Sequence, residues 1–196
     1  MKTQLFTVVF LMSLHTPLLR AETSNMPEYA NVDGWSVRVD ESLNNGCFVA
    51  TLYEGDTLLR IGFDRENNNF YALFGDPLWK SIEYGKKYNV EIKFGNESKW
   101  TAIARGMSFE PPQNEHYLWV NVGEDSDQIG IFLDEFMRET SVKLFYNEEI
   151  ISHLKLKGSY AAGMKLLECQ KLMNNQAEKD PFSTPGVSSG SDPFET

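Results

Sequence analysis

Short runs of alternating apolar and polar residues, separated by turn residues, constrain the fold of this chain most. In YNVEIKF, residues 88–94, Val90, Ile92 and Phe94 fall on one face of an extended strand, with polar residues on the other. Similar runs predict strands near residues 35–39, 47–53, 57–63, 70–74, 88–94, 100–107 and 117–122. Glycine and asparagine residues between the runs favour turns. This spacing is typical of a β-sandwich or barrel.

The pattern changes to a helical period after residue 122. In DSDQIGIFLDEFMRET, residues 125–140, apolar side chains recur every three or four positions, and Asp125 and Gln128 are placed like a capping pair. Two further strands are predicted at residues 142–146 and 149–156, joined by a tight turn. The sequence therefore predicts an amphipathic helix that lies on the sheet, followed by a hairpin.

The segment LKLKGSYAAGMKLLECQKL, residues 154–172, ends this hairpin and begins a second helix. Gly158 breaks the strand, and Ser159 is placed to cap the helix. One stripe of the helix carries Ala162, Leu166, Cys169 and Met173. Cys169 is therefore predicted to point toward the core.

These elements predict a mainly β, α+β fold, in which an antiparallel β-sandwich or open barrel is covered by two α-helices. Residues 34–175 would form one β-rich domain, preceded by a lead segment at residues 22–33. Residues 176–196 are rich in serine, glycine and proline, so we predict a disordered C-terminal tail. Removing residues 1–21 from the 196 leaves 175, enough for one sizeable core.

The first residues predict a secretory signal peptide. Lys2 precedes an apolar run over residues 5–14, and Ala21 is a small residue suited to a cleavage site. The alternative is a membrane anchor, but the apolar run is far shorter than the roughly 20 residues that cross a bilayer. We therefore expect a periplasmic or secreted protein with no transmembrane segment after cleavage.

The chain is acidic, with a formal net charge of -10. Cleavage after Ala21 would remove Lys2 and Arg20 and no acid, so the mature charge would be -12. Such a charge repels polyanions, which makes nucleic acid an unfavourable partner. Solubility is the preferred explanation of the acidity, and steering toward a basic partner is the alternative.

The chain contains only two cysteines, Cys47 and Cys169, separated by 122 positions. An even pair in an exported protein predicts a disulfide, because the compartment is oxidising. Closing a loop of this length would stabilise the fold by roughly 4 to 5 kcal/mol in the chain-entropy model. Two buried free thiols are the alternative, whereas the distance in sequence excludes a CxxC redox pair.

The sequence contains no recognised catalytic or cofactor motif. His116 lies in a polar loop and His153 on the outward face of a strand, so we expect both to be surface residues. The acidic loop at residues 123–130 begins like a calcium loop, but Ile129 and Phe136 stand where oxygen ligands are needed. Helix capping explains its acids better. We predict no catalytic residues, no metal site and no cofactor.

Aromatic residues offer two weaker candidates for binding. Trp35, Trp79, Trp100 and Trp119 could line a carbohydrate or peptide groove, although packing in the sheet core is the preferred interpretation. The tail repeats the sequence DPF, which places Phe182 and Phe194 after turn-forming Asp-Pro pairs. These two rings are candidates for docking in the groove of a partner, and a chance repeat is the alternative.

The order of elements resembles the invasion-associated locus B family of bacterial exported proteins. The resemblance covers roughly residues 34–173 and begins with the strand GWSV and an early cysteine. It is clearest at the closing strand and helix, at Leu154, Leu156, Gly158, Ala161, Ala162 and Leu167. It implies a small periplasmic β-rich domain with no established catalytic residues.

We therefore expect an exported periplasmic, non-enzymatic binding or accessory protein of the cell envelope, with a protein partner there. An inhibitor or immunity protein against a basic toxin or enzyme is one alternative, motivated by the net charge. A hydrolase with scattered catalytic residues such as Glu115, His116 and Asp125 is another.

Overall fold

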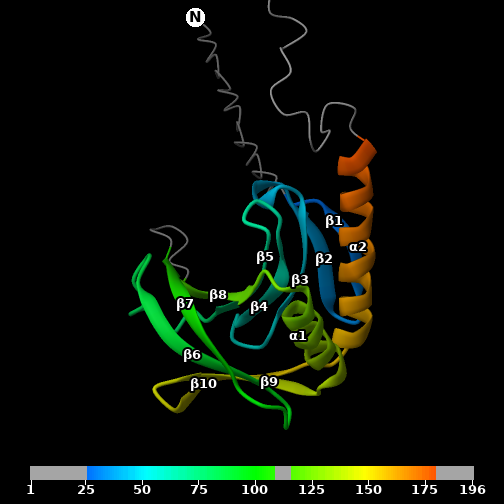
Figure 1. Cartoon of the computed structure of the whole chain (residues 1–196). Coiled ribbons are helices and arrows are strands. Elements are labelled where there is room, and N and C mark those ends of the chain that lie inside the picture. The colour runs from blue at the N-terminus through cyan, green and yellow to red at the C-terminus, as the bar shows by residue number, and fades with distance from the viewer. Residues whose placement is uncertain (1–25, 109–115, 180–196) are drawn as a thin grey trace, which may run out of the picture.

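The computed structural model describes residues 26–108 and 116–179 (Figure 1). The strands in these residues are β1 (Glu28–Val32), β2 (Trp35–Asp40), β3 (Gly46–Leu52), β4 (Leu58–Asp64), β5 (Asn69–Gly75), β6 (Lys87–Phe94), β7 (Trp100–Ser108), β8 (His116–Gly123), β9 (Ser141–Tyr146) and β10 (Glu149–Lys155). The helices are the 3-10 helix η1 (Glu41–Leu43) and the α-helices α1 (Ser126–Arg138) and α2 (Ser159–Lys179).

All of these strands form one antiparallel sheet in the order β1-β2-β3-β4-β5-β8-β7-β6-β9-β10. The chain meanders from β1 to β5, and β8, β7 and β6 then follow in reverse order. Strands β1 and β10 form the two edges, so the sheet is open. The predicted mainly β, α+β fold is confirmed, and the sheet corresponds to the open alternative.

Helix α1 shows that the sheet is strongly curved. The ring of Phe132 lies 6.1 Å from that of Phe70 on β5 and 4.9 Å from that of Phe94 on β6, between centroids. One turn later, Phe136 lies 5.3 Å from Trp35 on β2. In a flat sheet β2 and β6 would be roughly 29 Å apart, whereas a helix with its side chains is about 10–12 Å across. The sheet therefore curls around α1.

Helix α2 covers the first strands of the sheet. It packs on β1, β2 and β3 and also contacts α1 (Figure 1). The stripe predicted from the sequence is confirmed, because Ala162, Leu166 and Cys169 are fully buried and Met173 is partly buried against the core. The end of the domain is thereby packed on its beginning.

Two hydrogen bonds connect the end of β10 to the start of the sheet. The indole Nε1 of Trp35 on β2 donates to the carbonyl of Lys157 at 2.9 Å. The hydroxyl of Tyr53, just after β3, donates to the carbonyl of Lys155 at 2.7 Å. Because these strands lie near opposite edges of the sheet, the bonds hold the curved sheet in a partly closed shape.

The two faces of the sheet differ in what covers them. The inner face packs on the helices, and the predicted apolar face of β6 is confirmed, with Val90, Ile92 and Phe94 each 1% exposed. The outer face lies opposite the helices and carries polar, charged and aromatic side chains, among them Arg60, Lys87 and Trp119.

The predicted strands and helices are confirmed, with boundaries that shift by one or two residues. Strand β1 was missed, although the Asp33-Gly34 turn that joins it to β2, with φ of 51° and 88°, is typical of a two-residue hairpin. Ser159 is the first residue of α2, and not the residue before it. Helix α2 also continues through residues 176–179, which the sequence assigned to the tail.

In the described residues, neither α-helix combines the length and the apolar character that crossing a bilayer requires. The predicted signal peptide lies outside the residues that the structure describes.

Candidate functional site

The outer face of the sheet carries a row of adjacent side chains across five strands. Lys87 on β6 pairs with Arg105 on β7, which pairs with Trp119 on β8. Trp119 pairs in turn with Leu73 on β5, and Leu73 with Arg60 on β4. Partners on one face of an antiparallel sheet have Cβ atoms about 4.5 to 5.5 Å apart. The end of the row at Arg60 is buried, and the end from Trp119 to Lys87 is accessible to solvent.

The buried end of the row is a charged cluster around Arg60. Its side chain is 12% exposed, and Nη2 donates to Oδ2 of Asp40 at 2.5 Å. Its Nε donates to the hydroxyl of Tyr71 at 2.5 Å, and Cζ lies 3.6 Å from the centroid of the Phe48 ring. The guanidinium is thus held by hydrogen bonds and by an aromatic face. Such a fully partnered cation is suited to a structural role.

Asp40 stays ionised in this cluster. Burial raises the pKa of its carboxyl, but hydrogen bonds from Ser42 and Arg60 outweigh burial, so the pKa lies below its ordinary value. The same carboxylate accepts the backbone N–H of Ser42 and caps the short helix η1. Asp40 therefore joins β2 to β4 through an ion pair.

The open end of the row begins with a stacked aromatic pair. The rings of Tyr71 and Trp119 lie 3.9 Å apart between centroids, at an interplanar angle of 17°. Tyr71 is fully buried and Trp119 is half-buried. No other aromatic ring or cation in residues 26–108 and 116–179 lies over Trp119. Within the described part of the chain, the indole therefore has one face on Tyr71 and no aromatic or cationic partner on the other face.

Trp119 lines a depression of about 660 Å³ in the outer face, between β4, β5, β6, β7 and β8. Ile103 and Met107 on β7 supply further apolar surface, and the side chain of Ile103 is 57% exposed. We call this site the outer-face depression. Its volume falls in the range of about 300 to 1,000 Å³ that is common for small-molecule sites.

Two cations line the outer-face depression side by side. Lys87 and Arg105 are direct cross-strand partners, and neither forms an ion pair with any acid in the described part of the chain. Like charges directly opposite each other destabilise a sheet. A second pair of this kind, Lys93 and Lys143, lies on the same face but outside the depression. Only the pair Lys87 and Arg105 lies beside Trp119 in the depression, which distinguishes it from Lys93 and Lys143.

Amide side chains line the rest of the outer-face depression. Asn69 is 8% exposed, its Oδ1 is buried, and neither polar atom of the side chain has a hydrogen-bond partner among the described residues. Asp64, its cross-strand partner, is 4% exposed and accepts from the backbone N–H and Nδ2 of Asn67. Most buried amides have partners in a folded protein. An unpartnered one at a depression is suited to hold a ligand.

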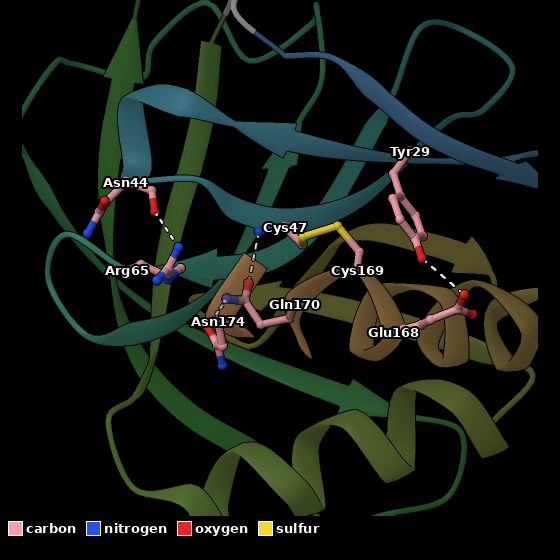
Figure 2. The surroundings of a disulfide bond; sticks show 8 residues. All are labelled: Tyr29, Asn44, Cys47, Arg65, Glu168, Cys169, Gln170 and Asn174. Carbon is pink, nitrogen blue, oxygen red and sulfur yellow. Dashed lines mark hydrogen bonds between the residues drawn. A yellow bond between two sulfur atoms is a disulfide. The ribbon is translucent and has the colours of Figure 1, made fainter. Parts of the chain in front are cut away.

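The disulfide predicted from the sequence is present (Figure 2). Cys47 on β3 and Cys169 on α2 are both fully buried, with Cα atoms 6.1 Å apart. The backbone N–H of Cys47 donates to Oε1 of the neighbouring Gln170 at 3.0 Å. Glu168, the residue before Cys169 on α2, accepts a hydrogen bond from the hydroxyl of Tyr29 on β1 at 3.0 Å. Covalent and polar links therefore fix α2 on β1 and β3, which is a structural role for the cysteines.

The structure separates the other candidates. His116 is the first residue of β8 and Asp125 follows the last residue of that strand, so seven residue steps, roughly 23 Å, separate His116 from the end of β8 that Asp125 follows. Asp125 caps α1 as predicted, accepting from two backbone N–H groups. Glu115 lies outside the described residues, as do the tail residues Phe182 and Phe194. The two described residues of the hydrolase alternative, His116 and Asp125, are thus not brought together.

The tryptophans fall into two groups. Trp35, Trp79 and Trp100 pack in or against the core, as the preferred interpretation predicts. Trp119 does not: it faces outward, so its assignment to the core is wrong. The segment YLWVN is apolar on both of its faces, which hid the orientation of this residue. The alternative of a groove lined by tryptophan applies to Trp119 alone.

No protein-family model, curated protein or solved structure matches this chain. The resemblance to the invasion-associated locus B family therefore stays a prediction.

Proposed function

We propose that this protein is an exported, non-enzymatic binding protein of the cell envelope and that the outer-face depression is its binding site. The predicted signal peptide supports export, and the buried disulfide fits an oxidising compartment outside the cytoplasm. A periplasmic location is part of this proposal.

The outer-face depression is the observation that carries the proposal. It combines the indole of Trp119 with two cations that have no acidic partner, and a buried amide that has no hydrogen-bond partner, among the described residues. Binding sites characteristically join apolar surface to a few converging polar groups. Each of these polar groups is costly or unused in the free protein and would gain a partner in a complex.

Reversible binding fits the site better than catalysis does. Lys87, Arg105, Asn69 and Trp119 supply hydrogen-bond donors, charge and a stacking surface. A hydrolytic site would need a nucleophile next to a base within hydrogen-bond reach. His116 and Asp125, the described candidates for such chemistry, do not line this depression.

The test is capture from an extract of the cell envelope on the immobilised mature protein. The wild type is compared with the variant Trp119→Leu/Arg105→Gln, which removes the stacking surface and one cation. Lys93→Gln/Lys143→Gln is the matched control, because it removes two cations of the same face outside the depression.

We expect the wild type and the control to retain the same molecules and the variant to lose them. Circular dichroism and the urea midpoint of each protein verify that it is folded. Equal capture by the wild type and the variant would assign binding to another surface, and no capture by the wild type would contradict a binding function.

A further inference from the structure

We propose that the ligand of the outer-face depression is a short acidic oligosaccharide, one that carries carboxylate, sulfate or phosphate groups on sugar rings. This inference rests on the proposed function and names the chemical class of the ligand. It follows from three properties of the site, which are the stacking surface, the array of amide and carboxylate groups, and the cation pair.

The first property is the flat apolar surface of Trp119. Its ring is fixed by stacking on the fully buried Tyr71, whose hydroxyl accepts a hydrogen bond from Arg60. A rigid aromatic surface of this kind makes contact at little cost in side-chain entropy. The C–H face of a sugar ring is flat and apolar and would lie on it, whereas a flexible aliphatic chain gains less from a fixed plane.

The second property is the hydrogen-bonding capacity around the ring. Asn69 offers an amide that no described residue bonds, Asn121 and Asn67 supply two more amides, and Asp64 supplies a buried carboxylate. Amides both donate and accept, and a carboxylate accepts from two or more donors. Sugar hydroxyl groups donate and accept in the same way. An acidic peptide, rich in carboxylates and poor in hydroxyl donors, would leave Asp64 facing like charge.

The third property is the cation pair. Lys87 and Arg105 stand side by side at the depression without an acidic partner in the described part of the chain. A carboxylate, sulfate or phosphate group between them would relieve their repulsion and form charge-assisted hydrogen bonds.

The acidity of the whole chain limits the length of this ligand. The net charge of -10 opposes a long polyanion, but charges farther away than about 8 Å are largely screened at physiological ionic strength. Two local cations therefore suit an oligosaccharide with few charges. The same reasoning keeps nucleic acids, with one charge on every nucleotide, unfavourable.

The test is calorimetric titration of the intact mature protein with three probes. The first is a short oligogalacturonate, the second is the same oligomer with its carboxylates methyl-esterified, and the third is an aspartate-rich peptide of equal charge. We expect binding of the oligogalacturonate, with the other two weaker by roughly tenfold or more, since a hydrogen bond to a charged group contributes about that much. Added salt should weaken the binding.

Two variants and a control connect binding to the site. Lys87→Gln/Arg105→Gln should weaken oligogalacturonate binding by roughly tenfold or more and abolish its preference over the ester. Lys93→Gln/Lys143→Gln should leave both unchanged. Asn69→Leu should weaken binding while leaving the urea midpoint equal or higher, because it removes an unpartnered buried amide. If Asn69 had only a structural role, Asn69→Leu would lower the urea midpoint.

The outcomes separate this inference from the function on which it rests. Equal affinity for the ester, or tighter binding of the peptide, would overturn the acidic oligosaccharide as the ligand. Absence of binding to all three probes, with capture from the envelope extract still dependent on Trp119 and Arg105, would overturn the ligand class and leave the binding function standing. If capture from the envelope extract did not depend on Trp119 and Arg105 either, both the ligand class and the assignment of binding to the outer-face depression would be overturned.

Discussion

Arg60 is the residue whose removal should damage the fold most through electrostatics. Breaking a buried ion pair from one side leaves the other charge without a partner, at a cost of about 3 to 5 kcal/mol. In Arg60→Met that charge is the carboxylate of Asp40, which is 3% exposed. We expect the free energy of unfolding, measured by urea denaturation, to fall by this amount.

An exposed ion pair supplies the control for this prediction. Arg38 on β2 also pairs with an acid, Glu28 on β1, but their side chains are 36% and 49% exposed. Arg38→Met should therefore cost less than about 1 kcal/mol. The double variant Asp40→Leu/Arg60→Met should recover much of the loss, because it leaves no buried charge. Equal losses for Arg38→Met and Arg60→Met would contradict a special role for burial.

Asp40 should also make stability depend on pH in the acid range. Its pKa in the folded protein lies below the ordinary value of 3.8, so its contribution is complete above that value and is lost as the pH falls through the folded pKa. We expect the urea midpoint of the wild type to drop more steeply below about pH 4 than that of Asp40→Asn. Parallel curves for the two proteins would show that Asp40 does not contribute.

The residues of the outer face mark where sequence reasoning failed. On β6 the polar residues alternate strictly, and the buried face was predicted correctly. On β5, by contrast, all seven residues of NFYALFG are buried, because the cluster of Arg60 and Tyr71 covers the outer side of this strand. Alternation cannot assign a face when both faces are buried. On β8, the segment YLWVN is apolar on both of its faces, so alternation likewise did not show that Trp119 faces outward.

At the scale of elements, the disulfide should decide how firmly α2 is held. Its loop of 122 positions gives roughly 4 to 5 kcal/mol in the chain-entropy model, so Cys47→Ala/Cys169→Ala should lose about that much stability. Hydrogen exchange should accelerate more in α2 than in α1, because α2 carries Cys169 and α1 carries no cysteine.

Chemical modification checks the same bond in the wild type. Alkylation of the unreduced, denatured protein should leave the intact mass unchanged, and reduction should expose both thiols, since no described cysteine is free. Alkylation without reduction would mean that the bond is absent in the exported protein. An unchanged urea midpoint in the double alanine variant would instead show that packing alone holds α2.

Strand β1 shows why a weak element escapes prediction. Its sequence EYANV has no strict alternation, and a bulge between Glu28 and Ala30 interrupts its pairing with β2. It forms because β2 offers an unpaired edge and because the side chain of Tyr29 reaches Glu168 on α2. Both causes are tertiary, so local propensity does not reveal them.

At the scale of the whole molecule, the sequence predicted the class of fold but not its curvature. Strand order follows from contacts far apart along the chain, such as the insertion of β8 beside β5 and of β6 beside β9. The two helical periods indicated what covers the sheet, and the cysteines indicated where its beginning and end meet. Rings of α1 contact β2, β5 and β6 on the inner face, and this fit depends on the size of a few side chains.

Phe132 is the residue on which this curvature should depend. Its ring contacts Phe70 on β5, Phe94 on β6 and Trp100 on β7, and it is 1% exposed. Phe132→Ala should lower the free energy of unfolding by about 3 to 5 kcal/mol, because it leaves a cavity between α1 and the inner face of the sheet.

Ile131 provides the matched control on the same helix, since its side chain is 54% exposed. Ile131→Ala should change the free energy of unfolding by no more than about 0.5 kcal/mol. In Phe132→Ala, hydrogen exchange should also accelerate more in β5, β6 and β7 than in β3, which the disulfide still links to α2, and its neighbour β2. A loss spread evenly over the sheet would show that the curved sheet holds its shape without Phe132.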